Sequence, residues 1–225
     1  MAIKVKKGTF TVPAATGALE VATGLGADVK LLILWGAPGT VEGFQAHNRG
    51  FHSFLTGTGT EQVCLAWASD DAVTPANVGR RLAEQAISLL SNGTPTLDAE
   101  AAFTSFGTGA DSGKFTLNVT DAPAASFTVH YLAVGGDGLL NAKVLKKNIS
   151  TGTGTEAETG AGFQPTHAIA IPTSTGSGAA VPAAKRRCST SASARPTAPP
   201  SSAPPSPRTT RAPPPTRTSR TSRRS

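Results

Sequence analysis

Apolar and polar side chains alternate most clearly between residues 103 and 136. Residues 115–119 and 127–132 each follow this two-residue period, which is typical of a strand with one buried face. Glycines precede the first run, a proline turn separates the two, and Gly135 and Gly136 close the second. The pattern predicts two strands that face one core through these side chains: Phe115, Leu117, Val119, Phe127, Val129 and Tyr131.

The remaining apolar runs predict further strands separated by turns. Short strands are expected around residues 10–12 and 19–21. Residues 29–35 form a continuous apolar run, which predicts a central strand buried on both faces. Residues 39–59 have no clean period and are expected to form a long loop that carries a short strand. Residues 62–67 alternate again, with large apolar side chains on one face and small ones on the other.

Residues 77–90 fit two interpretations. Leu82, Ala86, Leu89 and Leu90 match the stripe of a helix, whereas Ile87 and Leu89 match a strand, and the pattern alone slightly favours the helix. The chain as a whole is poor in aromatic residues and rich in Gly and Thr. Many short strands with such turns predict an all-β protein with a β-sandwich or jelly-roll-like domain.

A weak internal repeat divides the chain. Such a period is typical of tandem domains. We therefore expect a β-sandwich module at residues 1–140 and a partial second module at residues 141–181, which begins with a glycine turn and an apolar strand ending at Ile171. A shift of 136 residues aligns the identical pairs that carry this prediction: Glu20 with Glu156, Thr23 with Thr159, Gly24 with Gly160, Gly26 with Gly162, and Ile33 with Ile169.

Charge is distributed unevenly along the chain. Residues 1–184 carry 11 Lys and Arg against 14 Asp and Glu, a net charge of −3, while residues 185–225 carry ten Lys and Arg and no acid. The high isoelectric point therefore belongs to the tail, and binding of nucleic acid is expected there only as non-specific attraction to phosphate. Because residues 182–225 contain no Val, Leu, Ile, Phe, Tyr or Trp, they are expected to be disordered.

The amino-acid composition of this tail is also restricted to a few residue types. Pro, Ser, Thr and Ala dominate, and their codons share cytosine at the second position. A GC-rich gene read one base out of frame produces such a composition. We hypothesise that the chain leaves its parental frame between about Ser174 and Lys185, so that a shifted downstream frame of the gene would encode the missing strands of a second module.

Few residues suggest chemistry. His47, His52, Asp70 and Asp71 are the one set with imidazoles and carboxylates close enough in sequence for a metal or acid–base site, although loop polarity explains them as well. Ser53 lacks the context of a hydrolase nucleophile. The two cysteines lie in different regions, so Cys64 is expected to be a buried thiol. We therefore expect no enzyme, no cofactor and no metal.

Four short motifs follow one another in the sequence: D-A-E-A at residues 98–101, S-F at 105–106, G-K-F-T-L-N at 113–118 and H-Y-L-A-V-G-G at 130–136. They resemble the D-x-E-A, S-F, G-F-T-L-N and H-Y-L-A-x-G-G segments of a family of tailed-bacteriophage virion proteins. Its tandem copies often open with a G-F-x-P turn, which residues 162–165 match and the first copy does not. The resemblance implies a β-sandwich-like module with a structural or adsorption role, and it favours a strand over a helix at residues 77–90.

The leading hypothesis is a non-enzymatic virion structural protein, tail-associated or a minor component, that assembles with other copies and other virion proteins. The chain has no apolar run long enough to span a membrane, so we expect it to be made in the host cytoplasm. A capsid decoration protein is an alternative. A second alternative is a host-adsorption module that binds a surface glycan, whose expected contact residues, with Trp35, are these: Phe44, Phe51, Phe54, His47 and His52.

Overall fold

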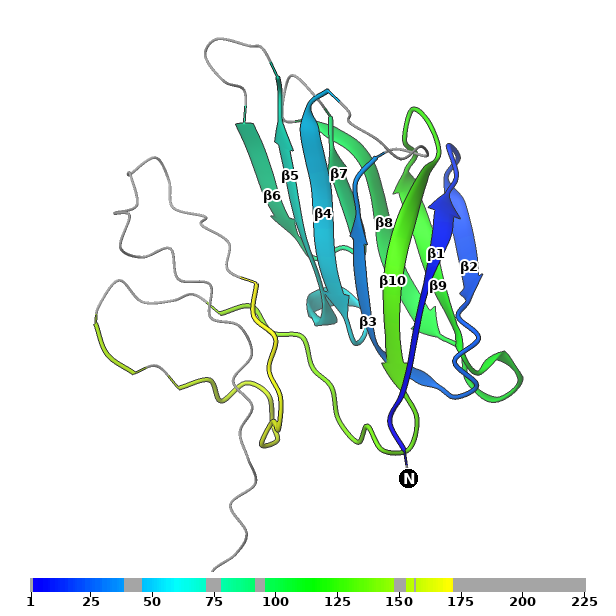
Figure 1. Cartoon of the computed structure of the whole chain (residues 1–225), viewed down its shortest axis with the longest axis vertical. Coiled ribbons are helices and arrows are strands. Elements are labelled where there is room, and N and C mark those ends of the chain that lie inside the picture. Colours follow the sequence, from blue (N-terminus) through cyan, green and yellow to red (C-terminus); the bar gives the residue numbers. More distant parts are fainter. Residues whose placement is uncertain are drawn as a thin grey trace, which may run out of the picture.

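The computed structural model describes residues 2–38, 46–71, 78–91, 96–147, 153–155 and 157–171. Two antiparallel sheets lie face to face, which confirms the predicted all-β sandwich (Figure 1). One sheet has the order β1-β10-β3-β4-β5-β6, and the other has the order β2-β9-β8-β7. The strands are β1 (Lys4–Val12), β2 (Gly17–Ala22), β3 (Val29–Gly36), β4 (Asn48–Leu55), β5 (Gln62–Ser69), β6 (Val78–Ala83), β7 (Ile87–Leu90), β8 (Leu97–Phe106), β9 (Lys114–Asp121) and β10 (Phe127–Gly135).

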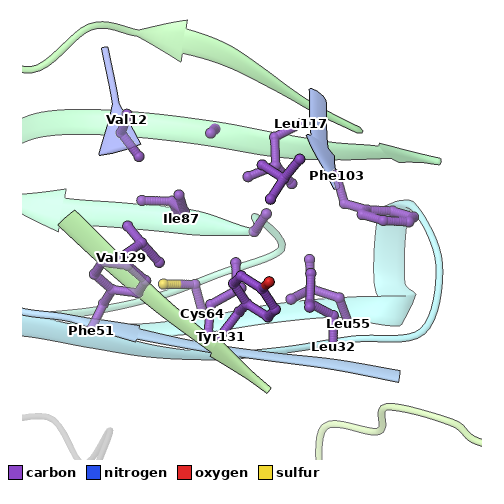
Figure 2. Close-up of a cluster of buried hydrophobic side chains, with 14 of the residues drawn as sticks. Val12, Leu32, Phe51, Leu55, Cys64, Ile87, Phe103, Leu117, Val129 and Tyr131 are labelled. Carbon is purple, nitrogen blue, oxygen red and sulfur yellow. The ribbon is translucent and has the colours of Figure 1, made fainter. Parts of the chain in front are cut away.

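The core lies between the two sheets, and side chains from both point into it (Figure 2). The two strands predicted from the alternating pattern are β9 and β10, and all six of their predicted core side chains are buried. They do not pair with each other, because the chain crosses from the four-stranded sheet to the six-stranded sheet between them. Their apolar faces therefore meet across the core, which is how a sandwich buries both.

The six-stranded sheet has an unusual distribution of side-chain size. On β5 the small residues Cys64, Ala66 and Ala68 point into the core, while the large residues of the same strand are half-buried on the other face. The strand β3 also alternates, with Leu32 and Leu34 buried in the core. The prediction that β3 is buried on both faces was wrong, because no layer of the described structure covers its outward side.

The structure decides two further predictions. The strand expected within the loop at residues 39–59 is β4, which is eight residues long, and residues 39–45 lie outside the described part. Residues 78–90 hold no helix, which confirms the strand interpretation that the resemblance favoured over the helix of the pattern alone. Instead they form β6 and β7, which lie in different sheets. The chain passes from one sheet to the other at residues 84–86. The two-residue alternation is interrupted there, so the apolar positions of the two strands together resemble the spacing of a helix.

Charged and polar side chains tie the sheets together at the β4–β7 side. The guanidinium of Arg49 donates to the Asp98 carboxylate at 2.5 Å and to the Leu90 carbonyl at 3.2 Å. Arg81 donates to Ser88 Oγ at 2.9 Å, and its Nη1 forms an ion pair with Glu100 Oε1 at 2.7 Å. Each of these contacts joins a strand of the six-stranded sheet to the four-stranded sheet.

After β10 the chain runs along the lower end of the sandwich. The N–H of Val144 donates to Thr56 Oγ1 at 3.2 Å, Lys146 pairs with Glu84, and Lys147 lies 3.7 Å from Glu158. The described residues from 136 to 171 contain no strand, so the strand expected to end at Ile171 is not formed. None of the described strands pairs with these residues, and a strand needs a partner. The division at residues 140 and 181 remains a prediction, and residues 172–225 lie outside the described part.

Candidate binding surface

The outward side of the six-stranded sheet carries an extended apolar and aromatic surface, which we call the outer face. Its residues project away from the core because they alternate with the buried positions. Most of their side chains are half-buried on the central strands, where His130 and Asn48 are exposed, and those on the two edge strands are exposed. The outer face consists of Val5, Lys7, Thr9 and Thr11 of β1, Thr128, His130, Leu132 and Val134 of β10, Leu31, Ile33 and Trp35 of β3, Asn48, Gly50, His52 and Phe54 of β4, Val63, Leu65, Trp67 and Ser69 of β5, and Val78, Arg80 and Leu82 of β6.

Strand register brings four rings together in the middle of this face. His130 of β10 lies opposite Trp35 of β3, which in turn lies opposite His52 of β4. The rings of Trp35 and His130 are nearly parallel, with centroids 5.9 Å apart and an angle of 12° between planes. The rings of His52 and Trp67 lie 5.3 Å apart at 31°. We call these four residues the aromatic row.

The Trp67 side chain is held in place by its neighbours. Its Nε1 donates to Asn48 Oδ1 at 3.4 Å. A Cβ atom at Gly50 would lie 2.9 Å from the Trp67 ring and 2.8 Å from the Gly36 carbonyl, so the ring occupies the space that a side chain at residue 50 would fill. The aromatic row is therefore supported by close packing on β4, which limits the orientations that the indole can adopt.

The electrostatic character of the outer face is neutral to basic. Lys7 and Arg80 are its permanent charges, and no Asp or Glu belongs to the outer-face residues defined above. Burial lowers the pKa of His52 below its ordinary value, so this imidazole is neutral at pH 7. A neutral His between tryptophan side chains adds a hydrogen-bonding group without adding charge.

The structure separates the predicted contact residues. Phe51 is fully buried in the core, with 0% of its surface exposed, so it cannot contact a ligand on the surface. Phe54 and His52 lie on the outer face together with Trp35. Phe44 lies outside the described residues. His47 precedes β4 and is not part of the outer face.

His47 is instead close to the two aspartates with which the sequence grouped it. Its Nδ1 accepts the backbone N–H of Asp71 at 3.1 Å and lies 3.4 Å from Asp70 Oδ1. His47 has a positive φ of 66°, which is uncommon for a residue other than Gly. The fourth member, His52, points away on the aromatic row. Among the described residues, no three His, Cys, Asp or Glu side chains are grouped closely enough to hold a metal ion.

The hydroxyl and thiol side chains in the core have structural roles. Ser53 Oγ donates to the Ala86 carbonyl at 2.5 Å, on the opposite side of β4 from His52, so the two cannot act as a nucleophile and its base. Cys64 is buried beside the Ser88 carbonyl, and burial raises the pKa of its thiol to about 12. The predicted buried thiol is confirmed, and it stays protonated at neutral pH.

Sequence reasoning missed Trp67 and His130 as members of the candidate site. Their strands had been recognised, and His130 faces away from the core between the predicted core residues Val129 and Tyr131. The sequence does not reveal the register that places His130 opposite Trp35, nor the strand order that places β4 between β3 and β5. Two tryptophans and two histidines at outward positions of neighbouring strands were the signal, and it appears only after the strands are paired.

Comparisons of the chain with protein-family models, with curated protein sequences and with solved structures each returned no match. In the part of the chain that the structure describes, no helix has the length and apolar character needed to cross a membrane.

Proposed function

We propose that this chain is a non-enzymatic structural component of a tailed-bacteriophage particle, associated with the tail or present as a minor virion protein. Support comes from the motif resemblance and from the places that those motifs occupy in the fold. The proposed partners are other virion proteins and further copies of the chain. The proposed location is the assembled particle.

The observation that carries the proposal is that the motif residues belong to the framework of one module. Asp98 and Glu100 of the D-x-E-A segment form the ion pairs with Arg49 and Arg81 that join the sheets. The G-K-F-T-L-N segment enters β9, and the H-Y-L-A-V-G-G segment is the second half of β10 with the turn after it. These motifs stabilise the fold of one module. A virion family built from tandem copies of a module would share such fold-determining residues.

Labelling of purified particles tests the proposal. Particles of the phage that carries this gene are reacted with antibody against residues 1–140 and examined by electron microscopy with immunogold. Gold on the tail supports the proposal, and gold on the capsid supports the decoration alternative. Particles that contain no trace of the chain, by labelling and by mass spectrometry, would overturn both.

A second candidate function is recognition of a host-surface glycan, and the aromatic row favours it. The face of an aromatic ring carries partial negative charge, and the C–H groups on one side of a pyranose carry partial positive charge, so the two pack favourably. Trp35, His130, His52 and Trp67 place such rings on neighbouring strands of the six-stranded sheet. The exposed threonines of β1 on the same face could donate hydrogen bonds to sugar hydroxyl groups.

A glycan array distinguishes this candidate from a purely structural role. Binding that is lost in Trp35→Ala and in Trp67→Ala, but kept in Thr128→Ala on the same face, would support recognition by the aromatic row. Circular dichroism must show that all three variants remain folded. No binding by the intact chain, or equal binding by all variants, would overturn it. Phe51→Ala is unsuitable because it removes a core side chain.

A further inference from the structure

The described part of the chain contains a strand-like segment without a partner and a sheet edge without a neighbour. Residues 166–171, which we call the donor segment, read Thr-His-Ala-Ile-Ala-Ile and form no strand, and Ile169 is 63% exposed. In Figure 1 this yellow stretch carries no arrow and lies beside the sandwich. The strand β6 is one edge of the six-stranded sheet, and its Val78 and Leu82 side chains are 67% and 41% exposed.

The side-chain pattern of the donor segment matches this edge of the sheet. On β5 small residues point inward and large ones outward, and the inner side of β6 has the small residues Gly79 and Ala83 on either side of Arg81, which pairs with Glu100. The donor segment alternates in the same way, with Ala168 and Ala170 on one side and Ile169 and Ile171 on the other. The opposite edge, β1, differs because it turns Phe10 and Val12 inward.

Charge argues against self-pairing of the opposite edge. The edge strand β1 contains Lys4, Lys6 and Lys7. Pairing β1 with β1 of another copy would place these basic side chains against one another, which disfavours the contact. The donor segment contains no Lys, Arg, Asp or Glu. It can therefore approach β6 without repulsion.

From these observations we infer that the donor segment of one copy adds as an antiparallel seventh strand to the β6 edge of a second copy. The donor segment and β6 are each six residues long, and full overlap pairs Thr166 with Ala83 and Ile171 with Val78. Every other neighbouring pair of strands in both sheets is antiparallel. In the described part of a single copy, neither the donor segment nor β6 has a strand on its open side, and the partner we infer for both is another chain of the same sequence.

This contact is heterologous, because a donor on one copy meets an acceptor on the next. Two copies can exchange donors reciprocally to close a dimer, and a continuing series gives an open chain. Backbone hydrogen bonds would hold the added strand, and Ile169 would lie beside Arg80 on the outer face. The inference concerns pairing in solution and does not depend on the proposed virion role. A chain found in particles but monomeric in solution would overturn only this inference.

Light scattering coupled to size-exclusion chromatography of the full chain gives the first test. The wild-type chain is expected to have at least the mass of a dimer. A donor variant, Ile169→Lys with Ile171→Lys, and an acceptor variant, Val78→Lys with Leu82→Lys, are each expected to be monomeric. Mixed in equal amounts, the two variants should form a one-to-one complex. The donor variant keeps an intact β6 edge, and the acceptor variant keeps an intact donor segment. Leu140→Lys, at a side chain 75% exposed elsewhere, should keep the wild-type mass.

Disulfide trapping gives a second test that does not require charged substitutions. Chains with Val78→Cys and chains with Ile171→Cys, both carrying Cys188→Ser, are mixed and oxidised, since opposite residues of antiparallel strands lie within disulfide range. A linked species of twice the chain mass is expected, and Val5→Cys in place of Val78→Cys should abolish it. A monomeric wild type, a mixture that does not associate, or a link formed only between two chains of the same variant would overturn the inference.

Discussion

The two glycines that end the H-Y-L-A-V-G-G motif make a sharp prediction about stability. A Cβ atom at Gly135 would lie 1.9 Å from the backbone carbonyl oxygen of Asp28, more than 1 Å closer than such atoms approach in proteins. The same carbonyl accepts the N–H of Gly136 at 3.2 Å, and Gly136 itself has a φ of 83°. The substitution Gly135→Ala must therefore displace the chain that enters β3.

The expected cost follows from these contacts. Inserting a methyl group into a closely packed site costs about 1–3 kcal/mol. Displacement of the Asp28 carbonyl also weakens its hydrogen bond with Gly136, which contributes about 1 kcal/mol. Gly135→Ala should therefore lower the free energy of unfolding by about 3 kcal/mol, equivalent to roughly 10 °C in Tm for a domain of this size.

Urea unfolding, followed by the fluorescence of Trp35 and Trp67, measures this change. Gly59→Ala is the matched control, because its φ of 59° disfavours a side chain while no atom lies within 4 Å of the added Cβ. Backbone strain alone predicts a loss of about 1 kcal/mol there. If Gly135→Ala were no more destabilising than Gly59→Ala, steric contact with Asp28 would not be the reason for glycine at this position.

Three further predictions address side chains elsewhere in the sandwich. Replacing Arg49 by Met leaves the Asp98 carboxylate, 18% exposed, without this ion pair, and urea unfolding should show a loss of about 1–2 kcal/mol, against no loss if the pair is merely superficial. The pKa of His52 is lowered in the folded state, so the unfolded chain binds more protons and stability should fall as the pH drops below about 6.5; His52→Gln should lose less stability between pH 7.5 and pH 5 than the wild type, and an equal loss would contradict the assignment. In a Cys188→Ser chain the Cys64 thiol, with its pKa of about 12, should react with a thiol reagent at pH 8 only as fast as the protein unfolds, and rapid labelling of the folded chain would show that it is accessible.

Strands were predicted well where one face is apolar and the other polar. The β9 and β10 patterns have this contrast, because Phe115 and Leu117 alternate with Thr116 and Asn118. The β4 pattern has no such contrast, since its inner side includes Ser53 between Phe51 and Leu55 while its outer side includes Phe54. A buried serine and an outward phenylalanine cancel the period, so the pattern indicated a short strand within a loop and did not give the bounds of β4.

The candidate site was predicted less well than the fold for a related reason. Phe51 and Phe54 are equivalent in sequence terms, since both are aromatic residues in a glycine-rich stretch. Their positions differ by an odd number of residues on one strand, which sends one into the core and the other to the outer face. Which of the two faces outward depends on how β4 pairs with β3 and β5, and that is set by contacts distant in sequence.

The size inversion on β5 connects the two proposals. Small residues inside allow β7 to pack closely beneath β4 and β5, and the large side chains displaced from the interior are then left on the outer face. Exposed apolar surface of this extent disfavours a freely soluble monomer unless something covers it or uses it. The donor segment would lengthen the outer face by one strand, with Ile169 beside Arg80 and Ile171 beside Val78. Assembly through the β6 edge would therefore enlarge the surface that carries the aromatic row, so loss of pairing in the donor variant should weaken any glycan binding without a change in Trp35 or Trp67.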